Sequence, residues 1–202
     1  MDAGLIPDYC TICDPDPVMV NYISKASRKT MFLLSTAVAP EVVTRLRGFN
    51  IVFWHCHSEA NEEGIKEFEP DYQAVGGGCT VGLRSLSLAI IMGYSNIHFF
   101  GFDSCMNGDE HHAYDFSTKE EDVGKIYKIR IGFGTPGDKS YDAAGYQLAQ
   151  AEQFATFYRN FGKYFTPTFH GPGLLPDVFE AIQRHTKETK VSNLIEVTGV
   201  NL

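Results

Sequence analysis

Short apolar runs alternate with segments of helical spacing along the first half of the chain. The apolar runs are YCTIC, MFLLS, IVFWH and NIHFFGFD, at residues 9–13, 31–35, 51–55 and 96–103. They contain so few polar side chains that we predict strands of a parallel sheet covered on both faces. Helical crossovers are predicted between them at residues 18–27, 40–47 and 80–92. This order indicates a doubly wound, mostly parallel α/β fold of Rossmann-like type.

The pattern changes after residue 103, where a polar, turn-rich segment begins. KIYKIRIGF then alternates as an exposed strand does, and DKSYD follows a Gly/Pro turn, so we predict a small β-ribbon. A long helix at 143–161, a last strand at 164–170 and a short helix at 177–185 complete the pattern. We therefore expect one α/β domain over residues 1–185 and a C-terminal tail at 186–202. The acidic stretch 58–71 is interpreted as a solvated helix or loop.

Composition narrows the class of protein. The 202 residues are 44% hydrophobic, which suits one sizeable core. The formal net charge is −8 and the chain has no run of Lys or Arg, so nucleic acid is not an expected partner. The apolar stretches are too short to span a bilayer, and MDAGLIPDYC does not resemble a signal peptide. Five cysteines favour reduced thiols and a cytoplasmic location.

The segment GGGCTVGLRS is the first candidate binding site. Thr80 is a good helix N-cap, so Gly77 and Gly78 lead directly into the start of a helix that also contains Gly82. Free N–H groups and the helix dipole make such a terminus an anion site. The segment matches neither the Walker loop nor the dinucleotide fingerprint. A tight turn in which the glycines permit close packing therefore remains the alternative.

The longer segment GGGCTVGLRSLSLAIIMGYSNIHFFGFDS resembles the MptE-like family. GLIPDYCTICDPDP resembles the family's earlier PD-strand-D segment, and KIRIGFGTPGDKSYDAAGYQLAQAEQF resembles its late ribbon and long helix, so the resemblance covers most of residues 4–176. The chain is also similar to bacterial sialyltransferase-like and flagellin-modifying transferases. Members of these families typically open with a strand ending in a G-N-G-P-S-L-like loop that meets nucleotide phosphates. No such sequence occurs in this chain.

The resemblance implies nucleotide-dependent transfer of one of two kinds. MptE-like enzymes resemble pyrophosphokinases that pass a diphosphate from ATP, with Mg²⁺, to a hydroxymethyl-dihydropterin. The sialyltransferase-like relatives instead use CMP-linked nonulosonic sugars. We expect the first activity, with a small-molecule nucleotide as partner, and we leave a homo-oligomer open. Because the family's glycine loop is missing, a non-catalytic binding or structural remnant is the third hypothesis.

Two aspartates follow predicted strands. Asp14 directly follows the first run and Asp103 ends NIHFFGFD, and the carboxyl ends of parallel strands meet at one rim of a sheet. Mg²⁺ prefers hard oxygen ligands shared with phosphates, so we predict both as metal ligands and Asp103 as catalytic. Asp14 is also expected to contact the nucleotide. The alternative for both is turn capping by a short acidic side chain.

The loop after Asp103 contains DEHHAYD. His111 and His112 are candidates for a general acid or base, and Tyr114 for contact with a base or a phosphate. The alternative is an ordinary solvated loop. His170 is the last residue of the last predicted strand and is expected either to return to the same rim or to be a capping histidine. No histidine lies between residues 113 and 169, where the sialyltransferase-like relatives are expected to place their base, and this weakens the CMP-sugar hypothesis.

Overall fold

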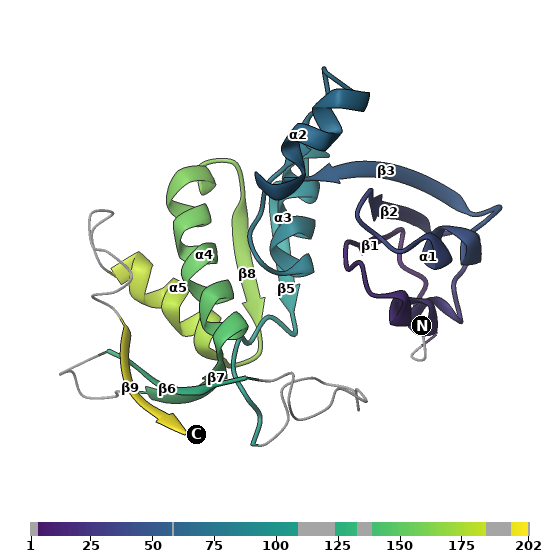
Figure 1. Cartoon of the computed structure of the whole chain (residues 1–202). Coiled ribbons are helices and arrows are strands. Elements are labelled where there is room, and N and C mark those ends of the chain that lie inside the picture. The colour runs from purple at the N-terminus through teal and green to yellow at the C-terminus, as the bar shows by residue number, and fades with distance from the viewer. Residues whose placement is uncertain (1–3, 58, 109–123, 133–138, 185–194, 202) are drawn as a thin grey trace. The chain divides into compact units, whose positions relative to one another are not determined.

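The computed structural model describes residues 4–57, 59–108, 124–132, 139–184 and 195–201 (Figure 1). The chain divides into two compact units, Met1–Gly76 and Gly77–Leu202, here called the first and the second unit. The single domain predicted over residues 1–185 stays a prediction. Within the described part of the chain, no helix has the length and apolar character needed to cross a membrane.

The first unit is built on a parallel sheet with the strand order β1-β2-β3-β4. Its strands are β1 (Tyr9–Ile12), β2 (Met31–Ser35), β3 (Asn50–Cys56) and β4 (Ala74–Val75). Its crossovers are the 3-10 helix η1 (Pro17–Ile23) and the helices α1 (Pro40–Arg45) and α2 (Glu59–Phe68). Three of these strands were predicted within two residues of their ends. The two-residue β4 was not predicted, because so short an apolar segment carries no periodicity.

The core of the first unit lies between β2 and the crossovers η1 and α1. Phe32 and Leu34 of β2 and Val42 of α1 are at most 1% exposed, as expected for a strand covered by helices. β3 differs from the prediction, since Val52 and Phe53 are 45% and 52% exposed. Successive side chains of a strand point to opposite faces, so both faces of β3 are open at this point, and β4 pairs only with its last two residues.

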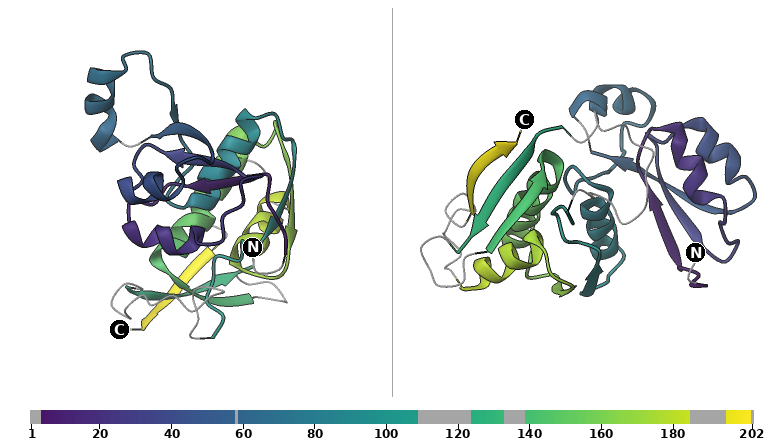
Figure 2. Two further views of the ribbon diagram at one scale, coloured as in Figure 1. Left: turned by 90° about the vertical axis from the view of Figure 1, so that its right-hand side faces the viewer. Right: turned by 90° about the horizontal axis from the view of Figure 1, so that it is seen from below.

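The second unit combines parallel strands, helices and an antiparallel ribbon (Figure 2). Its helices are α3 (Val81–Ile91), α4 (Gly145–Phe161) and α5 (Leu174–Arg184). Its strands are β5 (Asn96–Phe100), β6 (Ile126–Ile131), β7 (Lys139–Ala144), β8 (Thr166–His170) and β9 (Ile195–Asn201). β5 and β8 pair in parallel, whereas β6 pairs antiparallel with both β7 and β9. The predicted α/β class with a parallel sheet and a small ribbon is confirmed, and β9 adds a strand inside the predicted tail.

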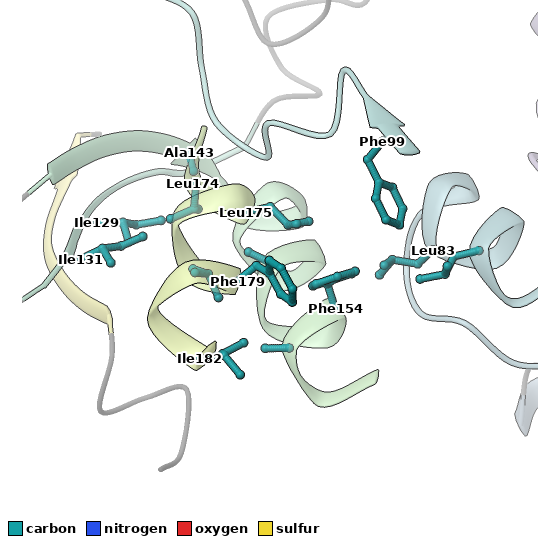
Figure 3. Packing of buried hydrophobic residues seen from close by; sticks show 14 of the residues in the cluster. Leu83, Phe99, Ile129, Ile131, Ala143, Phe154, Leu174, Leu175, Phe179 and Ile182 are labelled. Atoms are coloured by element: carbon teal, nitrogen blue, oxygen red, sulfur yellow. The ribbon is translucent and has the colours of Figure 1, made fainter. Parts of the chain in front are cut away.

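Aliphatic and aromatic side chains together fill the core of the second unit, and Phe154 lies among them (Figure 3). Phe154 of α4 is fully buried, and its ring centroid lies 5.9 Å from that of Phe99, 5.3 Å from that of Phe169 and 6.0 Å from that of Phe179. One side chain of α4 thus packs against both parallel strands and α5. These contacts hold the carboxyl ends of β5 and β8 in place.

Candidate functional site

A pocket of about 480 Å³ lies where β5 and β8 end. Because Phe100 pairs with His170, the two strands end side by side and their following loops meet. This is the edge at which open parallel sheets bind ligands. The pocket is lined by residues of both loops and by neighbouring aromatic side chains: Phe99, Gly101, Phe102, Asp103, Cys105, Met106, Asn107, Tyr141, Phe169, His170, Gly171, Pro172, Gly173 and Pro176.

Asp103 lines the pocket and is held through its backbone. The Leu175 N–H donates to the Asp103 carbonyl oxygen at 3.1 Å. Gly173 lies directly against Asp103, since a Cβ added to this glycine would be 2.6 Å from the Asp103 Cα. Burial raises the pKa of the Tyr146 hydroxyl, and the nearby Asp103 carboxylate adds to that rise.

Ser104, the next residue, has a strained backbone. Its φ is +55°, which is uncommon for a residue other than glycine, and its side chain is 2% exposed. Among the described residues its buried hydroxyl has no hydrogen-bond partner. Strain of this kind concentrates at functional sites and costs about 1–3 kcal/mol. The sequence reasoning missed Ser104, because a serine in a loop carries no signal of its backbone angle.

The glycines of GGGCTVGLRS mainly permit close packing. A Cβ on Gly77 would lie 2.8 Å from the Leu83 carbonyl oxygen, so the loop folds back onto the helix that it precedes. The Cys79 N–H donates to Gln153 Oε1 at 2.7 Å, which takes that donor away from any ligand. These contacts match the tight-turn alternative for Gly77 and Gly78.

The first turn of α3 nevertheless retains free donors. Thr80 is the N-cap, as predicted, and its hydroxyl and carbonyl oxygens accept from the N–H groups of Leu83 and Arg84. The N–H groups of Val81 and Gly82 have no acceptor among the described residues. Gly82 touches the ring of Phe102, which lines the pocket, and a Cβ there would overlap that ring. The N-terminus of α3 therefore contacts Phe102 from behind the pocket wall, and none of the described residues of its first turn lines the pocket itself.

His170 lines the same pocket as Asp103 and belongs to an aromatic stack. Its Nε2 is 2.9 Å from His98 Nδ1, and its ring lies parallel to that of Phe100 with centroids 4.2 Å apart. All three side chains come from β5 and β8. The stack orients the His170 ring at the edge of the pocket.

Tyr141 forms another wall of the pocket, and a buried carboxylate holds it. Asp177 of α5 accepts a short hydrogen bond from the Tyr141 hydroxyl and a second one, of 2.8 Å, from Lys139 Nζ. The Asp177 side chain is only 10% exposed. A buried carboxylate is stable when it is paired and hydrogen-bonded, so these contacts fasten the ribbon to α5.

The contact of Tyr141 with Asp177 leads us to expect that the free energy of unfolding falls at alkaline pH. Burial, reinforced by Asp177, raises the pKa of Tyr141 above its ordinary value of 10.0. As pH rises past about 10, the unfolded chain releases this proton before the folded chain does, so the free energy of unfolding falls. We expect Tyr141→Phe to be less stable than the natural chain near pH 8 but to lose less stability by about pH 11. Denaturant titrations at both pH values measure this, and equal losses in the two proteins would contradict it.

Four further predicted residues, Asp14, His111, His112 and Tyr114, belong to other parts of the chain. Asp14 belongs to the first unit, where its Oδ1 accepts from the Asp16 N–H at 2.9 Å, as in the turn-capping alternative. Its pairing with Asp103 stays a prediction. His111, His112 and Tyr114 lie outside the described residues. No group of three or more His, Cys, Asp or Glu side chains within the described ranges is arranged to hold a metal ion by itself.

Comparisons with known proteins agree with the resemblance predicted from the sequence. Residues 1–109, slightly more than half of the chain, match the family model described as 6-hydroxymethylpterin diphosphokinase MptE-like. The fold is similar to that of the MAf glycosyltransferase from Magnetospirillum magneticum AMB-1, with a TM-score of 0.59 and 14% sequence identity. That similarity covers 86% of this chain but only 26% of the glycosyltransferase. No curated protein matches by sequence.

Proposed function

The chain belongs to the MptE-like family, and from this premise we propose that it is a nucleotide-dependent transferase that uses the pocket at the ends of β5 and β8. The reaction we favour is transfer of a diphosphate from ATP to a small hydroxymethyl acceptor of pterin type. The acceptor oxygen attacks the β-phosphorus, the bond between this phosphorus and the α-phosphate oxygen breaks, and AMP leaves. The hydroxyl proton passes to a base, for which we propose His111 or His112.

One observation carries this proposal: Asp103 and Phe102 line the same pocket, and Gly82, in the first turn of α3, packs against the Phe102 ring. The free N–H groups of Val81 and Gly82 suit phosphate oxygens, and they act without a charged side chain. Phosphoryl transfer needs mainly positioning and charge neutralisation. The N–H groups of a helix terminus position the phosphate oxygens. A carboxylate can hold a cation that neutralises their charge.

The donor set fits Mg²⁺ that is shared with a substrate. The pocket contains one carboxylate, Asp103, and one side-chain amide, Asn107, and Mg²⁺ is often held by one or two carboxylates together with phosphate oxygens and water. When bound, Mg²⁺ would neutralise charge on the phosphate oxygens. We propose Asp103 as its ligand, with Tyr114 and His170 as contacts of the nucleotide.

A thermal-shift titration with ATP, AMP, CTP and CMP, each with and without Mg²⁺, tests the proposal. A ligand at a hundred times its dissociation constant adds about 2.7 kcal/mol to the free energy of unfolding, which raises the melting temperature by a few degrees. We expect ATP with Mg²⁺ to give such a shift and Asp103→Asn to abolish it. Glu180→Gln removes an exposed carboxylate outside the pocket and is expected to leave the shift intact.

The other outcomes each select a different conclusion. A response to CMP and CTP alone would favour transfer from a CMP-linked sugar, the second candidate, for which the named glycosyltransferase of similar fold is the specific support. A chain that responds to none of the nucleotides would contradict both transferase hypotheses and favour a binding or structural remnant. An ATP response that survives in Asp103→Asn would place the site elsewhere.

A further inference from the structure

The first unit contains a hydroxyl, an imidazole and a carboxylate in one hydrogen-bonded chain. Ser35 pairs with Trp54 in the parallel register of β2 and β3, so Thr36 and His55 are neighbours at the ends of these strands. Thr36 Oγ1 lies 3.1 Å from His55 Nδ1, and Glu69 Oε2 lies 2.9 Å from His55 Nε2. The sheet and the segment after α2 thus bring together three side chains that are distant in sequence.

We call the hydrogen-bonded row of Thr36, His55 and Glu69 the relay. Hydrogen-bonding rules determine which group in the relay donates and which accepts. An ionised carboxylate only accepts, so the Nε2 of His55 carries the proton that faces Glu69. A neutral imidazole then has its lone pair on Nδ1, where it accepts the hydroxyl proton of Thr36. This is the arrangement that activates a nucleophile in hydrolases, with the two ring nitrogens exchanged relative to the Ser-His-Asp template.

The surroundings hold the relay in place. The Thr36 N–H donates to the Trp54 carbonyl oxygen at 3.0 Å, which continues the sheet pairing up to the hydroxyl-bearing residue. The ring of Tyr72 packs edge-on against His55 with centroids 5.4 Å apart. Because both ring nitrogens of His55 are engaged and Tyr72 packs against the ring, the imidazole has one preferred orientation.

A pocket of about 480 Å³ adjoins these groups and indicates the class of substrate. Thr36, His55 and Glu69 line one part of it, and its other walls are apolar or small: Ala37, Cys56, Gly64, Ile65 and Phe68. The carboxylate of Glu69 is exposed at the pocket, and the one lysine of α2, Lys66, is paired with Glu62. This negative surface disfavours a phosphate-bearing substrate, whereas a neutral acyl group fits the apolar walls.

We propose that Thr36, His55 and Glu69 form a second catalytic centre that hydrolyses small neutral carboxylic esters. Thr36 Oγ1 attacks the carbonyl carbon and its proton passes to His55 Nδ1. The bond between the carbonyl carbon and the alkoxy oxygen breaks, and the leaving alcohol takes the proton from His55. Water, deprotonated by His55, then attacks the acyl-threonine ester. The carboxylic acid leaves and the threonine hydroxyl is restored.

Hydrolysis of p-nitrophenyl butyrate by the full chain, measured as release of p-nitrophenol, tests this centre. We expect Thr36→Val, which removes the hydroxyl but keeps the shape of the side chain, to lower the rate by roughly 100-fold or more. Thr36→Ser should retain most of the rate. Intact-protein mass spectrometry after rapid acid quench should show one butyryl group, which peptide mapping places on Thr36.

Matched variants distinguish the loss of a catalytic group from a general loss of folded structure. Glu69→Gln should lower the rate, whereas Glu67→Gln, the same change at an exposed position outside the relay, should not. Circular dichroism checks that each variant is folded. A rate equal to that of buffer alone, a Thr36→Val protein as active as the natural chain, or butyryl groups on other residues would overturn the proposal. This centre does not depend on the proposed transferase, because its test contains no nucleotide and its residues lie in the first unit.

Discussion

Phe154→Ala is expected to lower the free energy of unfolding by about 3–5 kcal/mol, the usual cost of removing a fully buried aromatic ring. The loss is large because this ring packs against Phe99, Phe169 and Phe179, so that its removal leaves a cavity between the two parallel strands and the helices. Guanidinium denaturation followed by circular dichroism measures the change. Hydrogen exchange of the α4 amides shows whether the loss is located in the second unit.

Phe161→Ala is the matched control on the same helix. Its ring is 44% exposed, and its replacement is expected to cost no more than about 1.5 kcal/mol, because a half-exposed ring has less transfer free energy to lose. If the two alanine variants were equally stable, the core of the second unit would not be centred on Phe154.

Gly173→Ala is expected to cost about 1–3 kcal/mol and to abolish the nucleotide-induced thermal shift. A methyl group here would lie 2.6 Å from both the Cα and the carbonyl oxygen of Asp103, and these are backbone atoms that cannot rotate away. Asp103 would have to move, and with it the hydrogen bond from Leu175 to its carbonyl oxygen. Thermal melting with and without ATP and Mg²⁺ measures both effects.

Gly145→Ala serves as the control for this substitution. A Cβ at that position has only an ordinary contact of 3.7 Å with Tyr127, so we expect no loss of stability and an unchanged response to ligand. If Gly173→Ala kept the full nucleotide response, the position of Asp103 would not matter for binding, and the proposed site would be wrong.

Local signals were sufficient for most elements of the fold. Thr80 was predicted as an N-cap because a hydroxyl that precedes a helical pattern satisfies a free N–H group, and this requires only neighbouring residues. The ribbon strand β6 was visible in its alternating side chains. β4 and β9 were not predicted, because a short or polar strand is defined by its partner. β4 exists through two pairs with β3, and β9 exists through its pairing with β6.

Only part of the candidate site could be predicted from the sequence. The sequence indicated Asp103 and His170 by their places after predicted strands, and the structure puts both in the lining of one pocket. It did not indicate Gly173, Tyr141 or Asp177, which matter because they touch or hold the pocket from other elements. It also did not indicate the relay of Thr36, His55 and Glu69, whose members are ordinary residues when they are read one by one.

The amino-acid sequence by itself determined the α/β class, the main helices and strands, and the family. These follow from apolar periodicity, caps and contiguous motifs, which act between residues close in the chain. Only the tertiary structure decided that Gly77 packs against the backbone of α3, that Gly82 contacts the Phe102 ring, and that Ser104 has a positive φ. Those facts arise from contacts between distant segments and from backbone angles, and neither is encoded in any short stretch of residues.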